Sequence, residues 1–275
     1  MAGQRVSSDH TVSKRLGSFA LVLAGTFGTA YALGERLPGH DHSGGSTHDH
    51  GQGSARSPIA PAFEMAGYQL VTEQVDASSA TFHLLDPHGD AVKDFAQAHG
   101  ALLHVVLVRP DLSGFQHVHP AISADGSWTV TINEPGQWHV VFESTPIADG
   151  APLTRPIVVS VDLDDDTVID AVPLPPVDDV VEVDGLLVAR TGFVFTVTNA
   201  DGTTADNLEP YLEQVAHLIA FREGDLAFTH FHPFDGPGGT FDFGQGGSES
   251  GRYRVFLQFG HAGSVVTVPF TVVIP

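Results

Sequence analysis

Six histidines have the residue type and spacing for metal chemistry. They form two sets of three, one in the segment LLHVVLVRPDLSGFQHVHP and one in VAHLIAFREGDLAFTHFHP, and each member of the first set has a counterpart 113 residues later. The first set is His104, His117 and His119, and the second is His217, His230 and His232. Imidazole is a common ligand of divalent transition metals. A repeated set of three therefore predicts two metal sites.

The sequence around each set predicts a β-hairpin. We place the turn at 111–112 in the first copy and at 224–225, a good two-residue hairpin turn, in the second. The first histidine of each set then lies directly opposite the third, and the second shares their face, because side chains alternate along a strand. Opposed Cβ atoms are about 4.5–5.5 Å apart and diagonal ones about 7–8 Å, so the three imidazoles can reach one ion. A one-residue bulge would turn His104 to the other face. Phe115 and Phe228 are expected to line the histidine face.

A structural interpretation of the histidines stays open. The run around His104 is apolar on both faces, which predicts that this histidine is buried. A buried histidine pair bonded to backbone carbonyls would be copied by a duplication without any metal. A fourth ligand also stays open, since His139 lies on a later strand, whereas its counterpart Arg254 cannot bind a metal. The remaining histidines of the β-rich region are expected to be surface or core residues rather than ligands, and they are His83, His88, His99 and His261.

Composition limits the metals and partners. There is no cysteine and there are only two methionines, so thiolate sites, disulfides and methionine-rich copper(I) sites are excluded. Any site must use imidazole and carboxylate, which predicts copper(II) or zinc(II) and no organic cofactor. The formal net charge of −21 argues against nucleic acid as a partner and against docking on anionic lipid. An acidic surface raises the local concentration of cations, although it also acts simply as a solubilising surface.

The first 34 residues predict a leader segment. Residues 1–15 are polar and carry positive charge, which favours a cytoplasmic location. Residues 16–34 are uncharged and mostly apolar or small, and as a helix of about 28 Å they match a hydrocarbon core of roughly 30 Å. The segment ends in an A-x-A pattern, so it is either a retained transmembrane anchor, with the membrane as a partner, or a cleaved signal peptide. Both place the rest of the chain outside the cytoplasm, membrane-anchored or secreted.

Residues 35–62 are rich in His, Gly and Ser and are expected to form a disordered linker. The tripeptide His-Asp-His occurs twice in it. Imidazole and carboxylate on a flexible chain bind divalent ions weakly, so these arms either capture metal or are merely part of a spacer. Their histidines are His40, His42, His48 and His50.

The rest of the chain predicts an all-β fold in two tandem repeats. Short apolar strands alternate with turn residues, and only 205–216 could hold a helical turn, which Pro210 limits. We place the first repeat at 63–162, an Asp- and Pro-rich linker at 163–178, and the second repeat at 179–275. The late segments GQWHVVF and GRYRVFL align with an offset of 115. This pattern predicts immunoglobulin-like or cupredoxin-like β-sandwich domains after an N-terminal hydrophobic helix and a disordered linker.

The hairpin motifs carry a resemblance. The string HxxxxRxDLxxFxHxHP, which runs from His104 to Pro120, and the segment LEPYLEQVAHLIAFREGDLAFTHFHP at 208–233 resemble a group of bacterial extracytoplasmic proteins. The group is common in actinobacteria, and most of its members are uncharacterised. They carry an N-terminal membrane segment followed by β-domains of this type, and the resemblance covers 65–275. Some relatives with the same hairpin are joined to heavy-metal-associated segments, which implies a metal-handling role.

Three functions are consistent with these observations. The leading prediction is extracytoplasmic binding, buffering or transfer of a divalent transition metal, with copper ahead of zinc because of the affinity order. Binding should weaken as the pH falls through the imidazole range, because the ligands must be neutral. The second is an interaction or adhesion module, with an unknown protein partner, in which the histidine triads are structural. The third is a metal-dependent enzyme, because three histidines with an open position can activate water or oxygen. We predict no enzyme and name no catalytic residue, since the H-x-H strand lacks the following glutamate of cupin oxygenases and no G-x-S-x-G motif or phosphate loop is present.

Overall fold

Short apolar strands separated by turns make up the described part of the chain, which contains no helix. The computed structural model describes residues 66–76, 78–163, 170–205, 207–234, 238–244 and 249–275. They belong to a single unit, Arg56–Pro275. The predictions for 1–15, 16–34 and 35–62, including the four arm histidines, lie outside the described residues. Within the described ranges, no helix has the length and hydropathy needed to cross a membrane.

The first repeat is a sandwich of two antiparallel sheets, as predicted. Its strands are β1 (Gln69–Asp76), β2 (Ser79–Leu85), β3 (Phe95–Ala96), β4 (Leu103–Val108), β5 (Phe115–Val118), β6 (Trp128–Thr131), β7 (Trp138–Ala148), β8 (Ala151–Pro152) and β9 (Ile157–Leu163). One sheet has the order β1-β2-β6. In the other, β5 pairs with β4 and β4 with β7, while β3, β8 and β9 all pair with β7. The core between the two sheets includes Phe82, Trp128 and Phe142, which are 0–1% exposed.

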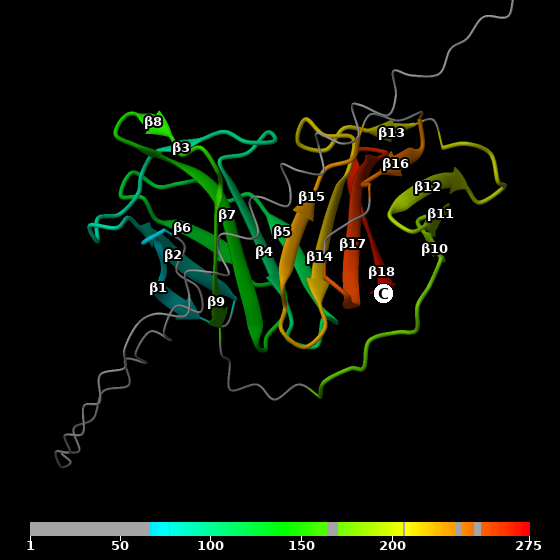
Figure 1. Cartoon of the computed structure of the whole chain (residues 1–275), viewed down its shortest axis with the longest axis horizontal. Coiled ribbons are helices and arrows are strands. Elements are labelled where there is room, and N and C mark those ends of the chain that lie inside the picture. The colour runs from blue at the N-terminus through cyan, green and yellow to red at the C-terminus, as the bar shows by residue number, and fades with distance from the viewer. Residues whose placement is uncertain (1–65, 77, 164–169, 206, 235–237, 245–248) are drawn as a thin grey trace, which may run out of the picture. The chain divides into compact units, whose positions relative to one another are not determined.

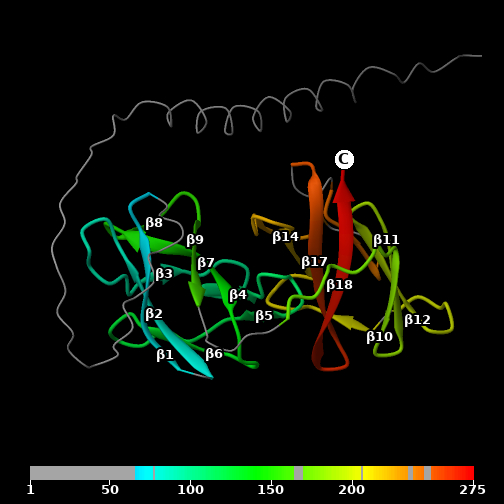
Figure 2. The same cartoon turned by 90° about the horizontal axis from the view of Figure 1, so that it is seen from below.

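The second repeat has the same plan. Its strands are β10 (Val180–Val183), β11 (Leu186–Thr191), β12 (Val194–Asn199), β13 (Leu208–Glu209), β14 (His217–Arg222), β15 (Phe228–Phe231), β16 (Thr240–Asp242), β17 (Gly251–His261) and β18 (Ser264–Ile274). One sheet has the order β10-β11-β12-β16, and the other has the path β18-β17-β14-β15 with β13 on β17. Figure 2 shows the long antiparallel pair of β17 and β18. The all-β prediction with two sandwiches is therefore confirmed.

In the second repeat, the apolar run 180–188 forms the two strands β10 and β11, because Asp184 and Gly185 adopt positive φ angles of 50° and 77° and turn the chain. One local expectation was wrong in this repeat. The helical turn considered at 205–216 is not formed by the described residues of this segment, 205 and 207–216. Leu208 and Glu209 instead pair with β17, and Pro210 follows directly. Proline removes a backbone donor, which suits the end of a short edge strand.

The strands that carry the first histidine of each set are buried on both faces. In β4, Leu103, Val105 and Leu107 point into the core of their own sandwich. The alternate residues, His104 among them, point to the opposite side, where Val106 and Val108 join a third apolar cluster. This cluster also contains Ile219, Phe221 and Phe256 of the second repeat. The hairpins β4–β5 and β14–β15 lie side by side (Figure 1), so the histidine face of each repeat packs against the other repeat.

The predicted hairpin register is confirmed in both copies. Val106 pairs with His117 in the first hairpin, and Ile219 pairs with His230 in the second, without a bulge in either pairing. Each first histidine therefore lies opposite the third histidine of its set. The prediction of a two-residue turn was wrong. The last backbone pairs are Arg109 N–H to Gly114 O and Arg222 N–H to Ala227 O, so a four-residue loop closes each hairpin around the predicted turn centre.

The linker between the repeats packs against both of them. Leu174 is buried in the third apolar cluster, together with residues of β4 and of β14. The backbone N–H of Val172 donates to Asp111 Oδ2 in the first hairpin loop, and Arg252 of β17 donates to the carbonyls of Leu174 and Pro175. The described part of this linker thus helps to hold the two histidine faces together.

Candidate metal centre

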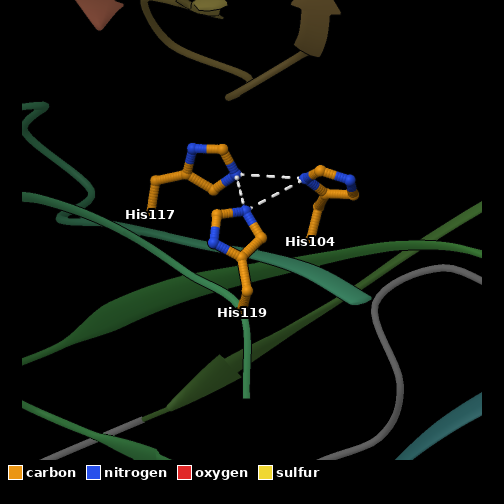
Figure 3. A group of neighbouring side chains, drawn as sticks. All are labelled: His104, His117 and His119. Atoms are coloured by element: carbon orange, nitrogen blue, oxygen red, sulfur yellow. Dashed lines mark hydrogen bonds between the residues drawn. The ribbon is translucent and has the colours of Figure 1, made fainter. Parts of the chain in front are cut away.

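The three histidines of the first set converge on one point. His104 is on β4, His117 is on β5, and His119 follows β5 directly. One ring nitrogen of each points inward (Figure 3): the distances are 3.4 Å from His104 Nδ1 to His117 Nε2, 3.2 Å from His104 Nδ1 to His119 Nε2, and 3.1 Å from His117 Nε2 to His119 Nε2. Three ligands at about 2.1 Å from a tetrahedral ion are roughly 3.4 Å apart. The triad therefore fits three corners of a tetrahedron.

The outer hydrogen bonds fix which nitrogen atoms of the first triad carry protons. His104 Nε2 lies 3.1 Å from the carbonyl oxygen of Ala98, and His117 Nδ1 lies 2.8 Å from the side-chain oxygen of Gln258. Both oxygens are acceptors, so these ring nitrogens are the N–H donors when each ring is neutral. The inward nitrogens of His104 and His117 are then both lone-pair acceptors, 3.4 Å apart. Two facing lone pairs repel each other, and a cation between them removes the repulsion.

The second set repeats this arrangement. His217 Nε2 lies 3.0 Å from the carbonyl oxygen of Tyr211, and His230 Nδ1 lies 2.8 Å from Glu143 Oε2. The inward nitrogens, His217 Nδ1 and His230 Nε2, are 3.1 Å apart. His232 Nε2 is buried and has no hydrogen-bond partner among the described residues. The ligand atoms of this triad all lie within 4.8 Å of one another. Each of the two triads could therefore hold a metal ion.

Burial keeps the triads in the neutral form that metals bind. His104 is 3% exposed and His217 is 0% exposed. Burial, assisted by the charges of neighbouring histidines, lowers the pKa of His119 to about 3. Burial lowers the pKa of His217 to about 4 despite its bond to the Tyr211 carbonyl, and it lowers the pKa of His117 and His230 well below 6.5. Each triad is thus a set of neutral imidazoles near pH 7.

Each repeat supplies an outer contact to the triad of the other repeat. Gln258 on β17 accepts from His117, and Glu143 on β7 accepts from His230. Glu143 lies opposite His104 in the sheet, and Gln258 lies opposite His217. The two residues are therefore structural counterparts, in agreement with the sequence offset of 115. Sequence reasoning missed both, although the same offset combined with the strand pairing would have found them.

The two triads are neighbours. The ring centroid of His230 lies 5.3 Å from that of His104 and 5.5 Å from that of His117, and the rings of His117 and His217 are 5.9 Å apart. The sequence predicted two separate sites, one in each repeat. The structure brings them together because the outer sheet faces of the two repeats pack on each other. The six histidines form one cluster, which we call the six-histidine cluster.

The structure does not bring His139 to the first triad. His139 pairs with Val108 on β4, four residues along β7 from Glu143, and its Nδ1 lies 2.6 Å from Asp162 Oδ1. It lies on the histidine face but at the other end of the sheet. Phe115 and Phe228 do lie beside this face, since both pack against the third apolar cluster and Phe115 stacks on Phe256 at 4.0 Å.

His99 is closer to the cluster than expected. Its ring lies 3.8 Å from that of His232, although the two belong to different repeats. The position equivalent to His99 is Leu212, and both residues have a left-handed backbone, with φ angles of 51° and 52°. By contrast, His83 lies 3.6 Å from Glu73, and His261 Nε2 lies 3.0 Å from Asn207, so these two are away from the cluster.

A cavity adjoins the first triad. Its volume is about 480 Å³, and its lining includes His117, Tyr211 and Gln258, together with the polar side chains of Gln116 and Asn133. The ring of Tyr211 lies 5.2 Å from that of His217 and 6.0 Å from that of His119, so this lining residue of the cavity is close to both triads. A small molecule in this cavity would lie next to a ligand histidine.

Comparison with known proteins adds a family but no activity. No curated protein matches the chain. Among solved structures, the crystal structure of a DUF3823 family protein from Bacteroides ovatus ATCC 8483 is 17% identical, with 68% of this chain and 92% of that chain covered and a TM-score of 0.16. A family model described as a domain of unknown function, DUF8832, matches residues 63–162 and again 179–275. The chain therefore belongs to the DUF8832 family and contains two copies of its domain.

Proposed function

We propose that this protein binds a divalent transition metal at two adjacent three-histidine sites, outside the cytoplasm. One observation carries the proposal. In each triad two histidine rings direct the N–H of one nitrogen at another acceptor, and the lone pairs of their other nitrogens face each other, 3.1–3.4 Å apart. Purely structural histidines would place a donor opposite an acceptor. Facing acceptors are instead the arrangement of a ligand set that a cation completes.

Copper(II) is the favoured metal and zinc(II) is the next. Imidazole nitrogen suits both ions, and the affinity order of divalent metals puts copper above zinc at a given site. The near-tetrahedral spacing of the first triad is also the geometry that zinc adopts, with one position left for a further ligand. The chain has no cysteine and only two methionines, so it lacks the sulfur ligands that copper(I) prefers.

The proposed role is buffering or handing over the metal rather than catalysis. The His-Asp-His arms at 40–42 and 48–50 would capture ions weakly, and the six-histidine cluster would hold them. The extracytoplasmic location rests on the sequence of residues 16–34, either as an anchor or as a signal peptide. A net charge of −21 supports cation capture because it raises the local concentration of cations.

The test is metal titration of the full chain, purified in detergent. Isothermal titration with copper(II) and with zinc(II) should show tight binding, which the double variant H117A/H119A should reduce by about one ion per chain. H139A is the matched control, because it removes a histidine of the same sheet face away from the triads. Absence of tight binding in the wild type, or equal binding by the double variant, would contradict the proposal and leave the triads as structural elements of an interaction module.

The cavity beside His117 favours a second candidate, a metal-dependent enzyme. A three-histidine site with an open position next to a cavity of about 480 Å³, lined by polar and apolar side chains, could accept a small substrate. The discriminating measurement is the copper(II) absorption spectrum of the loaded protein during titration with azide. A new charge-transfer band would show an exchangeable position open to the cavity, whereas an unchanged spectrum would favour a closed binding site.

A further inference from the structure

The residues that differ between the two triads lie behind the ligands. The first triad has the neutral amide of Gln258 on His117, and the second has the carboxyl group of Glu143 on His230. Both contacts are 2.8 Å long, both reach the Nδ1 of the second histidine of a set, and both come from the opposite repeat. The two contacts thus have the same geometry. They differ in the chemical group that accepts the hydrogen bond.

The acceptor behind a ligand histidine tunes the strength of that ligand. A carboxylate that accepts the imidazole N–H makes the opposite ring nitrogen more basic and orients the ring, and changes in such outer contacts alter metal affinity by about 10–100-fold. An amide oxygen orients the ring but carries no charge. The side chain of Glu143 is 21% exposed and that of His230 is 2% exposed, so solvent screens the pair only partly.

We propose that Glu143 and Gln258 make the two sites unequal, so that the triad of the second repeat binds the first metal ion and the triad of the first repeat binds the second. This inference rests on the proposed function. Both are positioning residues, because each acts through a histidine of the other repeat. Filling is therefore ordered by contacts between the repeats rather than by the ligands, which are the same in both sites.

The position of the triads strengthens the order. The closest rings of the two triads have centroids 5.3 Å apart, so two divalent ions would lie close enough to repel each other in a partly dry site. The first ion bound therefore lowers the affinity of the other triad for a second ion. Any initial difference between the sites is widened, and a protein with two grades of affinity can hold one ion firmly and release the other to an acceptor.

The experiment measures copper(II) affinity at each site separately. H119A leaves the second triad intact, and H232A leaves the first triad intact; neither removes a histidine bonded to Glu143 or Gln258. In the H119A background, E143Q should weaken copper binding by at least 10-fold. In the H232A background, Q258E should strengthen it by about the same factor. D162N is the matched control, because it neutralises the carboxylate of another histidine–carboxylate pair, His139–Asp162 at 2.6 Å.

The outcomes separate this inference from the proposed function. No copper binding by the wild type would overturn both. Binding of two ions with equal affinity, or an E143Q effect smaller than threefold in the H119A background, would overturn the ordering alone. If E143Q does not fold, as judged by circular dichroism, Q258E decides by itself: a gain of affinity supports the proposal and no gain overturns it. A purely structural role for Gln258 would not produce a gain.

Discussion

The two triads share their inner geometry and differ in the residues around them. In both, the first histidine donates to a backbone carbonyl six residues earlier, at Ala98 or Tyr211, and the second donates to a side chain of the opposite repeat. The differences are Glu143 against Gln258 and His99 against Leu212. The histidines are thus the same in the two triads, and the residues that contact them from outside differ.

The comparison also explains why a single repeat would not provide the buried surroundings that each triad has. A single sandwich would expose the histidine face of its outer sheet and would lack the acceptor for its second histidine. In this chain the acceptor comes from the partner repeat, and Ile219, Phe221 and Phe256 help to exclude water from the shared face. Low exposure in turn lowers the pKa of the histidines and strengthens electrostatic interactions at the site. The second repeat therefore covers the histidine face of the first as well as adding a second triad.

The largest expected effect comes from removing one ligand of each triad. H119A or H232A alone should lower the copper bound per chain from two ions to one, and H119A/H232A should leave no tight site, because two histidines hold an ion far more weakly than three. Elemental analysis after dialysis measures the stoichiometry. If either single variant lost both ions, the triads would be one indivisible site and the comparison between them would have no meaning.

Acid should destabilise the metal-free protein. The pKa of His217 is about 4 in the fold and about 6.5 in the unfolded chain, so the unfolded state binds more protons between these values. The free energy of unfolding should therefore fall as the pH drops from about 6.5 towards 4, by on the order of 3 kcal/mol from His217 alone. Urea unfolding at pH 7, 5.5 and 4.5 measures this loss. The variant H217Q should show a smaller slope.

The lowered pKa values also sharpen the expected pH dependence of metal binding. Free imidazole loses metal as the pH falls through about 6.5. In the folded protein the histidines stay neutral to lower pH, with the pKa of His119 at about 3. Copper should therefore remain bound at pH 5.5 and be released only on further acidification, as followed by its absorption. Release centred near pH 6.5 would show that the triads are more exposed than in this structure.

His99 should give a smaller effect that is greatest at one triad. Its ring lies 3.8 Å from that of His232, with the two planes tilted by 31°, and 6.4 Å from that of His104, and its equivalent in the other repeat is Leu212. H99A should weaken copper binding about threefold in the H119A background, because His232 loses a contact that orients it, worth about 0.5–1.5 kcal/mol for a pair of aromatic rings in contact. In the H232A background the effect should be smaller, because the ring of His99 is 6.4 Å from that of His104. Equal weakening in both backgrounds would indicate a general change in the fold.

The smallest expected effect comes from changes to the pair formed by His139 and Asp162. H139A and D162N alter a contact at the far end of the sheet and should change copper affinity less than twofold, as measured by isothermal titration. This pair has the same chemical groups as His230 and Glu143, but its histidine does not belong to a triad. A large loss of copper affinity in H139A would indicate that His139 is a ligand after all. The sheet would then have to rearrange when the metal binds.

The sequence by itself determined the repeat, the hairpins and the grouping of the histidines. Strand periodicity and turn residues are local signals, and the register follows from them because a shift by one residue would turn His104 out of its face. Pairing of Val106 with His117 and of Ile219 with His230 agrees with that reasoning. The four-residue loops could not be read in the same way, since a turn centre does not specify the loop length.

The tertiary structure decided what surrounds the histidines. An apolar strand such as β4 is buried on both faces, and the sequence does not say what covers the second face. That partner is the other repeat, which brings Glu143 to His230, Gln258 to His117 and His99 to His232. These contacts join residues far apart in the chain through packing of two domains, and packing is a property of surfaces rather than of local pattern. The two histidine triads could therefore be predicted from spacing, whereas their union into one cluster with different outer contacts could not.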